Sequence, residues 1–391
     1  MSPVPVSDPA RVMRLRQTEI EKALRDVLQS GHYVLGPQVE QLEHEFARWL
    51  GISHAIGVAN GTDALELALR GARLPVGARV AIPALTASAT AAAVVRAGMI
   101  PVVIDIDPLS LALDPQRLHE ACQRPWPASA ASVAAVIPVH LYGLPCDLDS
   151  LLAVAAEEGL AVIEDCAQSH GTRLRGRKTG TWGKTAAFSC YPTKSLPALG
   201  DAGLTVTDDA EIARRIRELR QYGWKLRHVS DEVGMNSRLD EVQAAVLRVH
   251  LAHLDEDNAR RADIARRYDE AFAGLPLRRP TTLAGAAVAP HQYVVLTPSR
   301  STLQDRLAQA AIQTSQLYPV PVNDQPAFAR LAAGHEAALA PPATPVARSV
   351  CEQLLCLPLH PFLTAEEVSR VIVAVRSFCE GSIPRKAPQD L

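Results

Sequence analysis

The feature that most constrains this chain is the alternation, over its first 250 residues, of short apolar runs with helical patterns. The apolar runs cover residues 55–59, 78–82, 101–104, 134–139 and 160–163. They are apolar on both faces, which is typical of strands that are buried on both sides. Helical patterns fall between and after them, at residues 64–70, 91–97, 148–158 and 210–222. This order predicts an α/β fold in which helices flank a mostly parallel central sheet.

A helical pattern of unusual length, residues 239–272, can carry the chain from one domain to the next. Beyond it, the sequence favours a strand at 292–296, a helix at 301–311 and a last helix after Thr364. The proline-rich residues 340–345 are expected to form a surface loop. We therefore predict two domains, a large α/β domain over residues 1–250 and a smaller α+β domain over residues 251–391.

The composition excludes several classes of protein. With 40 Lys and Arg residues against 42 Asp and Glu, the 391-residue chain has a formal net charge of −2, so no overall field attracts nucleic acid or an anionic membrane. Its seven cysteines show no CxxC pair and no zinc-ligand spacing, which predicts reduced thiols and no metal site. No apolar stretch reaches the roughly 18 residues of a spanning helix, and no signal-peptide pattern is present. We expect a cytoplasmic protein that binds neither nucleic acid nor membrane.

Lysine is rare in this chain, because only six of the 40 basic residues are lysines. A lysine in such a sequence suggests a task that arginine cannot perform, such as losing its proton and attacking a carbonyl. Lys194 is the best candidate, since it follows the end of a strand and the hydroxyl of Ser189. A solvated loop lysine is the other interpretation. Lys178 and Lys225 sit among arginines and are expected to be surface charges.

Two further segments carry polar groups at the ends of predicted strands. Residues 60–65 follow a buried strand and open a helix, so the NH groups of Thr62 and Asp63 are expected to be unpaired at the positive end of a helix dipole, where phosphate binds. A simple helix cap is the alternative there. Glu164 and Asp165 end another strand, where open α/β sheets keep their ligands, and one carboxylate could pair with a protonated heterocyclic nitrogen. An acid that merely ends the strand is the alternative.

Taken together, these segments supply what pyridoxal phosphate requires. They offer an amine at Lys194 to bind its aldehyde, a carboxylate at Asp165 for its ring nitrogen, and helix-end NH groups with the Ser189 hydroxyl for its phosphate. No one segment is decisive alone. Their joint presence in this order predicts a cofactor site.

At these residues the chain resembles the DegT/DnrJ/EryC1/StrS sugar aminotransferases, which are pyridoxal phosphate enzymes of fold type I. The resemblance spans nearly the whole chain. The segments that carry it are residues 36–40, 60–65, 139–143, 164–168, 189–194, 234–240 and 318–321. The resemblance implies a fold type I transferase with a small C-terminal α+β domain.

The resemblance also implies a role for each matching residue. Lys194 corresponds to the catalytic lysine, which binds the cofactor and moves the proton between substrate and cofactor. Asp165 corresponds to the acid that keeps the ring nitrogen protonated. The remaining cofactor-binding residues would be Ala167 against a ring face, Gln168 at the ring hydroxyl, Gly61, Thr62, Asp63 and Ser189 around the phosphate, and Asn236, which would reach the phosphate from the other subunit of a homodimer.

The family's reaction is a two-step transamination. It implies that L-glutamate gives its amino group to a nucleotide-linked keto sugar in deoxyamino-sugar biosynthesis, with Arg238, Tyr318 and Asn323 as candidate substrate contacts. The sequence leaves open whether C3 or C4 is aminated, and which nucleotide carries the sugar. A related sugar dehydratase that uses pyridoxamine phosphate is disfavoured, because such enzymes replace the lysine. A non-catalytic regulatory member is disfavoured by the intact Lys194, Asp165 and Ser189.

Some positions depart from the family pattern. Ala87 stands where an aromatic residue often stacks on the cofactor ring, so stacking is expected to be weaker or to come from elsewhere. Leu317 and Asn323 stand where the family often has histidine, so we expect altered substrate contacts from the small domain. His140 and His170 are expected near the site, more as structural histidines satisfied by the backbone than as catalytic groups.

Overall fold

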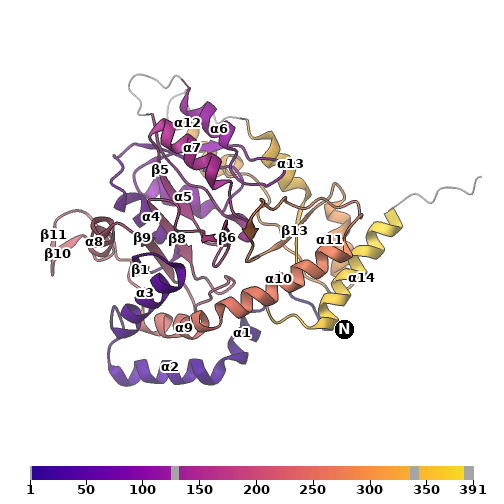
Figure 1. The fold of residues 1–391 in the computed structure, drawn as a ribbon, viewed down its shortest axis with the longest axis horizontal. Helices are drawn as coiled ribbons and strands as arrows, with labels where there is room; N and C mark the ends of the chain where they lie inside the picture. Colours follow the sequence, from indigo (N-terminus) through magenta and orange to yellow (C-terminus); the bar gives the residue numbers. More distant parts are fainter. Residues whose placement is uncertain (1, 125–131, 335–342, 383–391) are drawn as a thin grey trace, which may run out of the picture.

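The computed structural model describes residues 2–124, 132–334 and 343–382, and its centre is a seven-stranded sheet (Figure 1). From one edge to the other the strands are β1 (His54–Val58), β9 (Gly203–Thr207), β8 (Thr185–Ser189), β5 (Ala161–Asp165), β4 (Val133–Val136), β2 (Arg79–Pro83) and β3 (Ile100–Ile104). Within this sheet β9 runs opposite to the six other strands. The mostly parallel sheet is therefore confirmed, with β9 as a strand that the sequence pattern did not reveal.

Helices cover both faces of the sheet, which explains why its strands are apolar on both sides. Alternate residues of β2 show the division: Val80 and Ile82 join one buried cluster, whereas Ala81 joins another on the opposite face. The first face is covered by α4 (Gly61–Gly71), α5 (Ser88–Arg96) and α8 (Ala210–Leu219). The second is covered by α3 (Pro37–Leu50), α9 (Glu241–Ala252), α6 (Pro115–Cys122) and α7 (Leu148–Glu158).

Local sequence signals set several of these helix ends. The side chains of Asp114, Asp147 and Asp209 accept hydrogen bonds from backbone NH groups at the starts of α6, α7 and α8. Two N-terminal helices, α1 (Pro9–Leu15) and α2 (Gln17–Ser30), precede α3 and were not predicted. Asp8 caps α1, and Pro9 occupies its first position.

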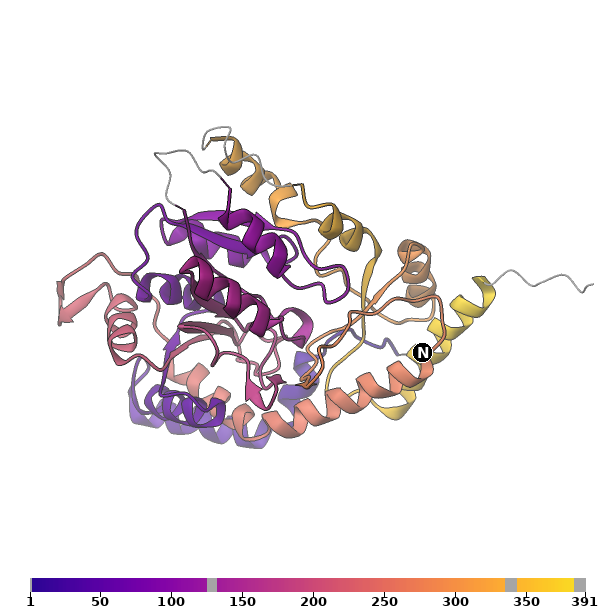
Figure 2. The ribbon, with the colours of Figure 1, turned by 45° about the horizontal axis from the view of Figure 1, so that its top comes forward.

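The long helix expected over residues 239–272 is two helices, α9 and α10 (Leu254–Ala271), which meet at His253. Figures 1 and 2 show α10 leading from the sheet to the C-terminal part of the chain. There β13 (Tyr293–Leu296) pairs antiparallel with β14 (Leu354–Leu357). The helices of this part are α11 (Arg300–Gln309), α12 (Pro326–Gly334), α13 (Pro345–Gln353) and α14 (Ala365–Ser382). Of the expected loop at 340–345, residues 340–342 lie outside the described residues, and Pro345 begins α13.

Short elements complete the fold. They are the 3-10 turns η1 (Leu141–Gly143) and η2 (Val322–Asp324), the strands β6 (Arg173–Leu174), β7 (Arg177–Lys178) and β12 (Ala286–Ala287), and the hairpin of β10 (Trp224–Leu226) and β11 (Val229–Ser230). In both ribbon views the hairpin projects from the side of the molecule opposite to α14 (Figures 1 and 2). None of the described helices has the length and hydropathy that crossing a membrane requires.

Candidate active site

The sheet order brings the predicted segments to one edge. β1, β5 and β8 run in the same direction, so their carboxyl ends lie together. Asp165 is the last residue of β5 and Ser189 the last of β8, and α4 begins directly after β1. Gly203, at the start of the antiparallel β9, pairs with Val58 on one side and with Ser189 on the other. The start of α4 therefore has to cross Gly203 to reach Ser189.

That crossing leaves no room for a side chain. A Cβ atom on Gly203 would lie 2.4 Å from the carbonyl oxygen of Asn60, and one on Gly61 would lie 2.5 Å from Cβ of Ser189. Neither glycine has a positive φ, so close approach rather than backbone conformation requires them. The two glycines bring the NH groups at the start of α4 and the Ser189 hydroxyl into one small cradle.

The start of α4 differs in one detail from our expectation. The side chain of Asn60 caps the helix and accepts a hydrogen bond from the Asp63 NH at 2.8 Å, so that NH is not unpaired. The Asp63 carboxylate is also engaged, because Arg96 and Ser237 each donate to it at 2.8 Å. The NH groups of Gly61 and Thr62, the first two residues of the helix, remain for a ligand.

Asp165 lies buried beside this cradle. The Thr90 hydroxyl donates to its Oδ2 at 3.0 Å, and the Ala167 NH donates to its Oδ1 at 3.1 Å. Burial raises the pKa of the Asp165 carboxyl, while those hydrogen bonds and the nearby charge of Lys194 act in the opposite direction. A second cation placed against Asp165 would stabilise its ionised form further. Thr90 was not singled out from the sequence.

Lys194 lies in the turn that follows β8, where its NH donates to the carbonyl of Tyr191 at 2.8 Å. Burial lowers the pKa of its amine, and the carboxylate of Asp165 is close enough to oppose that shift. An amine with a lowered pKa is a better nucleophile at neutral pH, because more of it is unprotonated. The structure thus brings together the amine and the carboxylate on which the sequence-based prediction rests.

Gln168 connects the sheet to the C-terminal part of the chain. Its Oε1 accepts a hydrogen bond from the Tyr142 NH at 2.7 Å, and its Nε2 donates to the Tyr318 hydroxyl at 3.3 Å. Burial raises the pKa of the Tyr318 hydroxyl, and the nearby carboxylate of Asp165 raises it further. Tyr318 therefore lies beside Gln168 and Asp165.

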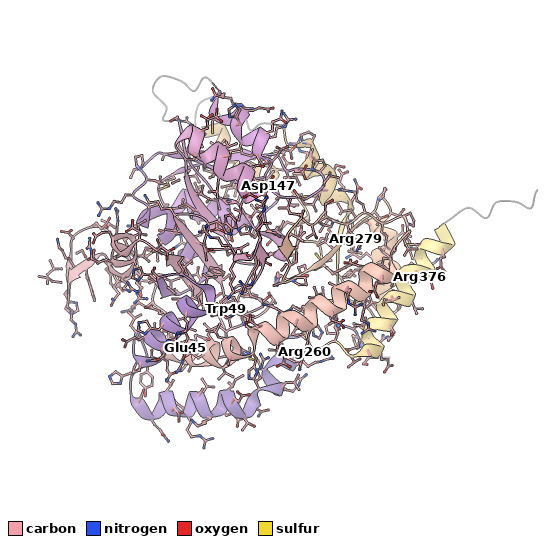
Figure 3. The ribbon with its side chains drawn as sticks, in the orientation of Figure 1. Glu45, Trp49, Asp147, Arg260, Arg279 and Arg376 are labelled. Carbon is pink, nitrogen blue, oxygen red and sulfur yellow. The ribbon has the colours of Figure 1, made fainter. Side chains whose placement is uncertain are left out.

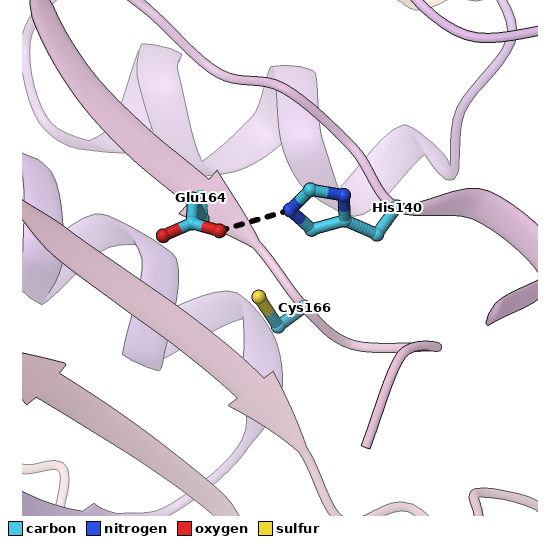
Figure 4. Close-up of side chains that lie close together, drawn as sticks. All are labelled: His140, Glu164 and Cys166. Carbon is cyan, nitrogen blue, oxygen red and sulfur yellow. Dashed lines mark hydrogen bonds and ion pairs between the residues drawn. The ribbon is translucent and has the colours of Figure 1, made fainter. Parts of the chain in front are cut away.

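A buried hydrogen-bonded pair, His140 and Glu164, supports the strand that carries Asp165 (Figure 4). Nδ1 of His140 accepts from the Cys146 NH at 3.1 Å, so its Nε2 carries the proton and donates to Glu164 at 3.0 Å. The Glu164 carboxylate also accepts three backbone NH bonds, from residues 180, 182 and 183, at 2.7–2.8 Å. Burial would raise the pKa of Glu164, but these hydrogen bonds outweigh it and hold the pKa below its usual value.

Cys166 lies beside this pair, and the ligand atoms of the three side chains are within 4.8 Å of one another. The hydrogen bonds already use both ring nitrogens of His140 and both carboxylate oxygens of Glu164. This chemistry is that of a hydrogen-bonded support rather than of a metal centre. The structural interpretation of His140 agrees with these contacts.

Two expectations about basic residues were wrong. His170 is fully buried, but neither ring nitrogen has a hydrogen-bond partner among the described residues, so the backbone does not satisfy it. Burial lowers its pKa to about 3. Lys178 is not a surface charge: it is buried, its Nζ lies 3.9 Å from the centre of the Trp49 ring, and it donates to the Trp49 carbonyl. Burial lowers the pKa of Lys178 to about 8. Lys225 is exposed, as expected.

Four other predicted residues have contacts of a different kind. Asn236 is exposed and pairs through its backbone with Gln221, and Arg238 lies 6.0 Å from the Tyr222 ring centre. Asn323 is buried and donates to Thr344 at 3.0 Å, which gives its amide a structural partner. Ala87 precedes α5 and offers only a methyl group. Among the described residues, none of the four makes a hydrogen bond to the cradle, Asp165 or Lys194.

Known proteins match this arrangement. A model of the DegT/DnrJ/EryC1/StrS aminotransferase family matches residues 15–376. The chain is 42% identical over 369 residues to the erythromycin biosynthesis sensory transduction protein EryC1 of Saccharopolyspora erythraea, covering 94% of this chain and 97% of that protein. It is 41% identical over 380 residues to the dTDP-3-amino-3,4,6-trideoxy-alpha-D-glucose transaminase of Streptomyces venezuelae, covering 96% of each. The crystal structure of S. venezuelae DesV superposes with a TM-score of 0.91 at 41% identity, covering 97% of this chain and 99% of that one.

Proposed function

Because this chain belongs to the DegT/DnrJ/EryC1/StrS aminotransferase family, a pyridoxal phosphate-dependent family, we propose that it transfers an amino group from L-glutamate to a nucleotide-linked keto-deoxysugar. The observation that carries this proposal is the shared sheet edge. A lysine of lowered pKa, a buried carboxylate and a cradle of helix-end NH groups meet there. We place the site in the large domain, residues 1–250, with the small domain, residues 251–391, covering it.

The residues present fit the cofactor. The cradle of Gly61, Thr62 and Ser189 offers helix-end NH groups and a hydroxyl as donors, which suits a phosphate. Asp63 would act indirectly, because its carboxylate anchors Arg96 and Ser237. Asp165 would hold the ring nitrogen, Ala167 would face the ring, and Gln168 would reach the ring hydroxyl. Thr90 would orient Asp165 from behind.

When bound, pyridoxal phosphate supplies an aldehyde that condenses with amines and an electron-poor ring that accepts the electron pair released at the substrate carbon. This chain's residues prepare that chemistry. Asp165 would keep the ring nitrogen protonated through its negative charge. The lowered pKa of Lys194 leaves its Nζ free to take a proton from the substrate carbon and to pass it to the cofactor. Tyr318 and Gln168 hold the small domain against the site.

We further propose the C3 position and a dTDP sugar for this chain. The support is the name of the S. venezuelae relative, which places the amino group on C3 of a dTDP-linked trideoxyglucose. Turnover of dTDP-linked 3-keto and 4-keto sugars, each with L-glutamate as donor, tests the assignment. Faster turnover of the 4-keto sugar would refute it.

The active form would be a homodimer with shared sites. Large apolar side chains are exposed on the projecting hairpin and on the turn before Lys194, among them Leu226 (69%), Val229 (57%) and Tyr191 (51%). Exposed apolar side chains of this kind favour a covered surface, and a second copy would bring Asn236 to the partner's phosphate cradle. The seven cysteines are all free thiols, which suits the reducing cytoplasm in which we place the reaction.

Lys194→Ala tests the function. We expect the wild-type protein to take up pyridoxal phosphate and turn yellow, and borohydride treatment to fix the cofactor to Lys194, as seen by peptide mass. The variant should show neither property and no transamination. Lys184→Ala, which removes an exposed lysine directly before β8, is the matched control and should behave as wild type. A colourless wild type, or a Lys194→Ala variant that retains turnover, would reject the proposal.

Mixing two inactive variants tests the shared site. If Asn236 acts in its partner's cradle, a heterodimer of Lys194→Ala and Asn236→Ala subunits has one site that carries both changes and one intact site. Activity should then return on mixing. Leu226→Asp should weaken the dimer in sedimentation, whereas Val373→Asp, an exposed valine on α14, should not. Absence of any recovery on mixing would contradict the assignment of Asn236.

A further inference from the structure

A buried guanidinium without a partner lies next to the site. Arg261, on α10, is 5% exposed, and its Nε and Nη1 atoms have no hydrogen-bond partner within the described part of the chain. Burial lowers the pKa of Arg261 to about 10, so the side chain is still charged at neutral pH. An unpaired buried charge is strongly unfavourable, and a native structure normally supplies its counter-charge.

Arg261 and Lys194 line the same small cavity, with a volume of about 20 Å³. Four segments form its walls besides α10: residues 7–12, residues 192–197, residues 291–292 and residues 359–361. The cavity thus lies where the N-terminal segment, the Lys194 turn and the C-terminal part of the chain meet. The positive charges of both Lys194 and Arg261 act on His291, which lies in the wall with them.

The other charged groups of the wall already have partners. Asp8 forms an ion pair with Arg11 at 3.1 Å, and Asp257 forms one with Arg16 at 2.7 Å. Burial lowers the pKa of His360 to about 4 and that of His291 well below its usual value, so both imidazoles are neutral at neutral pH. Apart from the amine of Lys194, Arg261 is the one charge of the described wall that lacks an ion-pair partner.

Neutral polar groups of the wall are also unsatisfied. His360 is 2% exposed, and neither of its ring nitrogens has a partner among the residues described. The Ser195 hydroxyl, in the same wall, is unpartnered as well. A charged fork with neutral NH and OH donors around it is the donor set that binds a carboxylate.

Two simpler occupants compete with a carboxylate. The free Oδ1 of Asp257, one helical turn before Arg261, could pair with Arg261 after a small movement. A cavity of this size also holds one water molecule, which would satisfy some of these atoms but not the charge.

We propose that Arg261, with His360 and His291, binds one carboxylate of the amino donor beside Lys194. This inference rests on the proposed function, because it gives the donor a place next to the reacting amine. It explains why a guanidinium is buried without a counter-ion: the counter-ion arrives with each molecule of donor. Arg261 is then a substrate-binding residue of the first half of the reaction only.

Glutarate, which has the carbon chain of glutamate without its amino group, is the probe. Calorimetric titration of the cofactor-loaded wild type should show binding, and Arg261→Met should weaken it at least tenfold. Arg261→Lys, which keeps the charge but loses the fork, should lie between them. Arg260→Met is the matched control, because Arg260 is on the same helix (Figure 3) but is half exposed and pairs with Glu256. It should bind glutarate as wild type does.

The temperature of thermal unfolding shows whether Arg261 has a partner within the protein. Without glutarate, Arg261→Met should unfold at the same temperature as the wild type or higher, since it removes an unpaired buried charge. A lower temperature would show that Asp257 is the real partner and would overturn the proposal. So would glutarate binding that is unchanged in Arg261→Met, or binding of inorganic pyrophosphate in preference to glutarate. Glutarate cannot react, so these results do not depend on whether the protein proves to be a transaminase.

Discussion

Gly203→Ala should separate the phosphate cradle from the rest of the fold. The added Cβ would lie 2.4 Å from the Asn60 carbonyl oxygen and 3.0 Å from the Gly61 nitrogen, both of which are backbone atoms. Ordinary contact begins at 3.4 Å, so the start of α4 has to move by about 1 Å relative to β9. Ser189, on the neighbouring strand, does not move with it.

The size of the effect follows from the bonds that this movement breaks. A hydrogen bond to a charged group contributes about 1.5–3 kcal/mol. Misplacing the two NH groups of Gly61 and Thr62 therefore weakens phosphate binding by about 3–6 kcal/mol, which is roughly a 10²–10⁴-fold increase in Kd. The chain should still fold, because residues 204–207 of β9 pair with β1 and β8 away from the clash.

Titration of the cofactor-free protein with pyridoxal phosphate and with pyridoxal measures this effect. The variant should bind pyridoxal phosphate far more weakly than the wild type does, yet bind pyridoxal, which has no phosphate, with little change. Gly381→Ala, whose Cβ meets nothing within 4 Å, is the control and should leave both affinities unchanged. If Gly203→Ala bound pyridoxal phosphate within threefold of wild type, the start of α4 would not be the phosphate site.

Two other predictions concern the carboxylates of β5. Glu164→Gln should lower the free energy of unfolding by about 3 kcal/mol in denaturant melts, because it leaves His140 and three backbone NH groups without their anion. Glu157→Gln, on the exposed face of α7, should have no effect, and an equally stable Glu164→Gln would contradict the supporting role. Asp165→Asn should abolish turnover but stabilise the cofactor-free protein at pH 7, because burial raises the pKa of Asp165 and the ionised form opposes folding there. That gain in stability should shrink as the pH falls toward the raised pKa, which thermal melts across a range of pH measure. A gain that grows on acidification would show that the pKa of Asp165 is lowered instead.

The strands and helices of the sheet were predictable because each is a local pattern. β2, β3 and β5 are apolar runs on both faces, and their observed bounds differ from the expected ones by one or two residues. α1 was missed although Asp8 and Pro9 carry its start signal, since a helix of seven residues has too little apolar periodicity to stand out.

The contacts of the site were less predictable, because they depend on strand order. Gly203 is essential to the cradle only because β9 lies between β1 and β8, and nothing within residues 200–207 specifies those neighbours. Thr90 reaches Asp165 from a helix 75 residues earlier in the chain. Single polar residues of this kind carry no pattern of their own, so the fold alone reveals them.

Lys178, which is buried, and Lys194, which is half-buried, show what the rarity of lysine can and cannot establish. Burial lowers the pKa of both Lys178 and Lys194, so rarity and pKa alone would make either of them a nucleophile. The amine of Lys178 is already occupied by the Trp49 carbonyl and ring. Lys194 follows a strand whose carboxyl end lies beside Asp165, and its amine has no such partner among the described residues. Position at the sheet edge, rather than scarcity, therefore distinguishes the reactive lysine from the structural one.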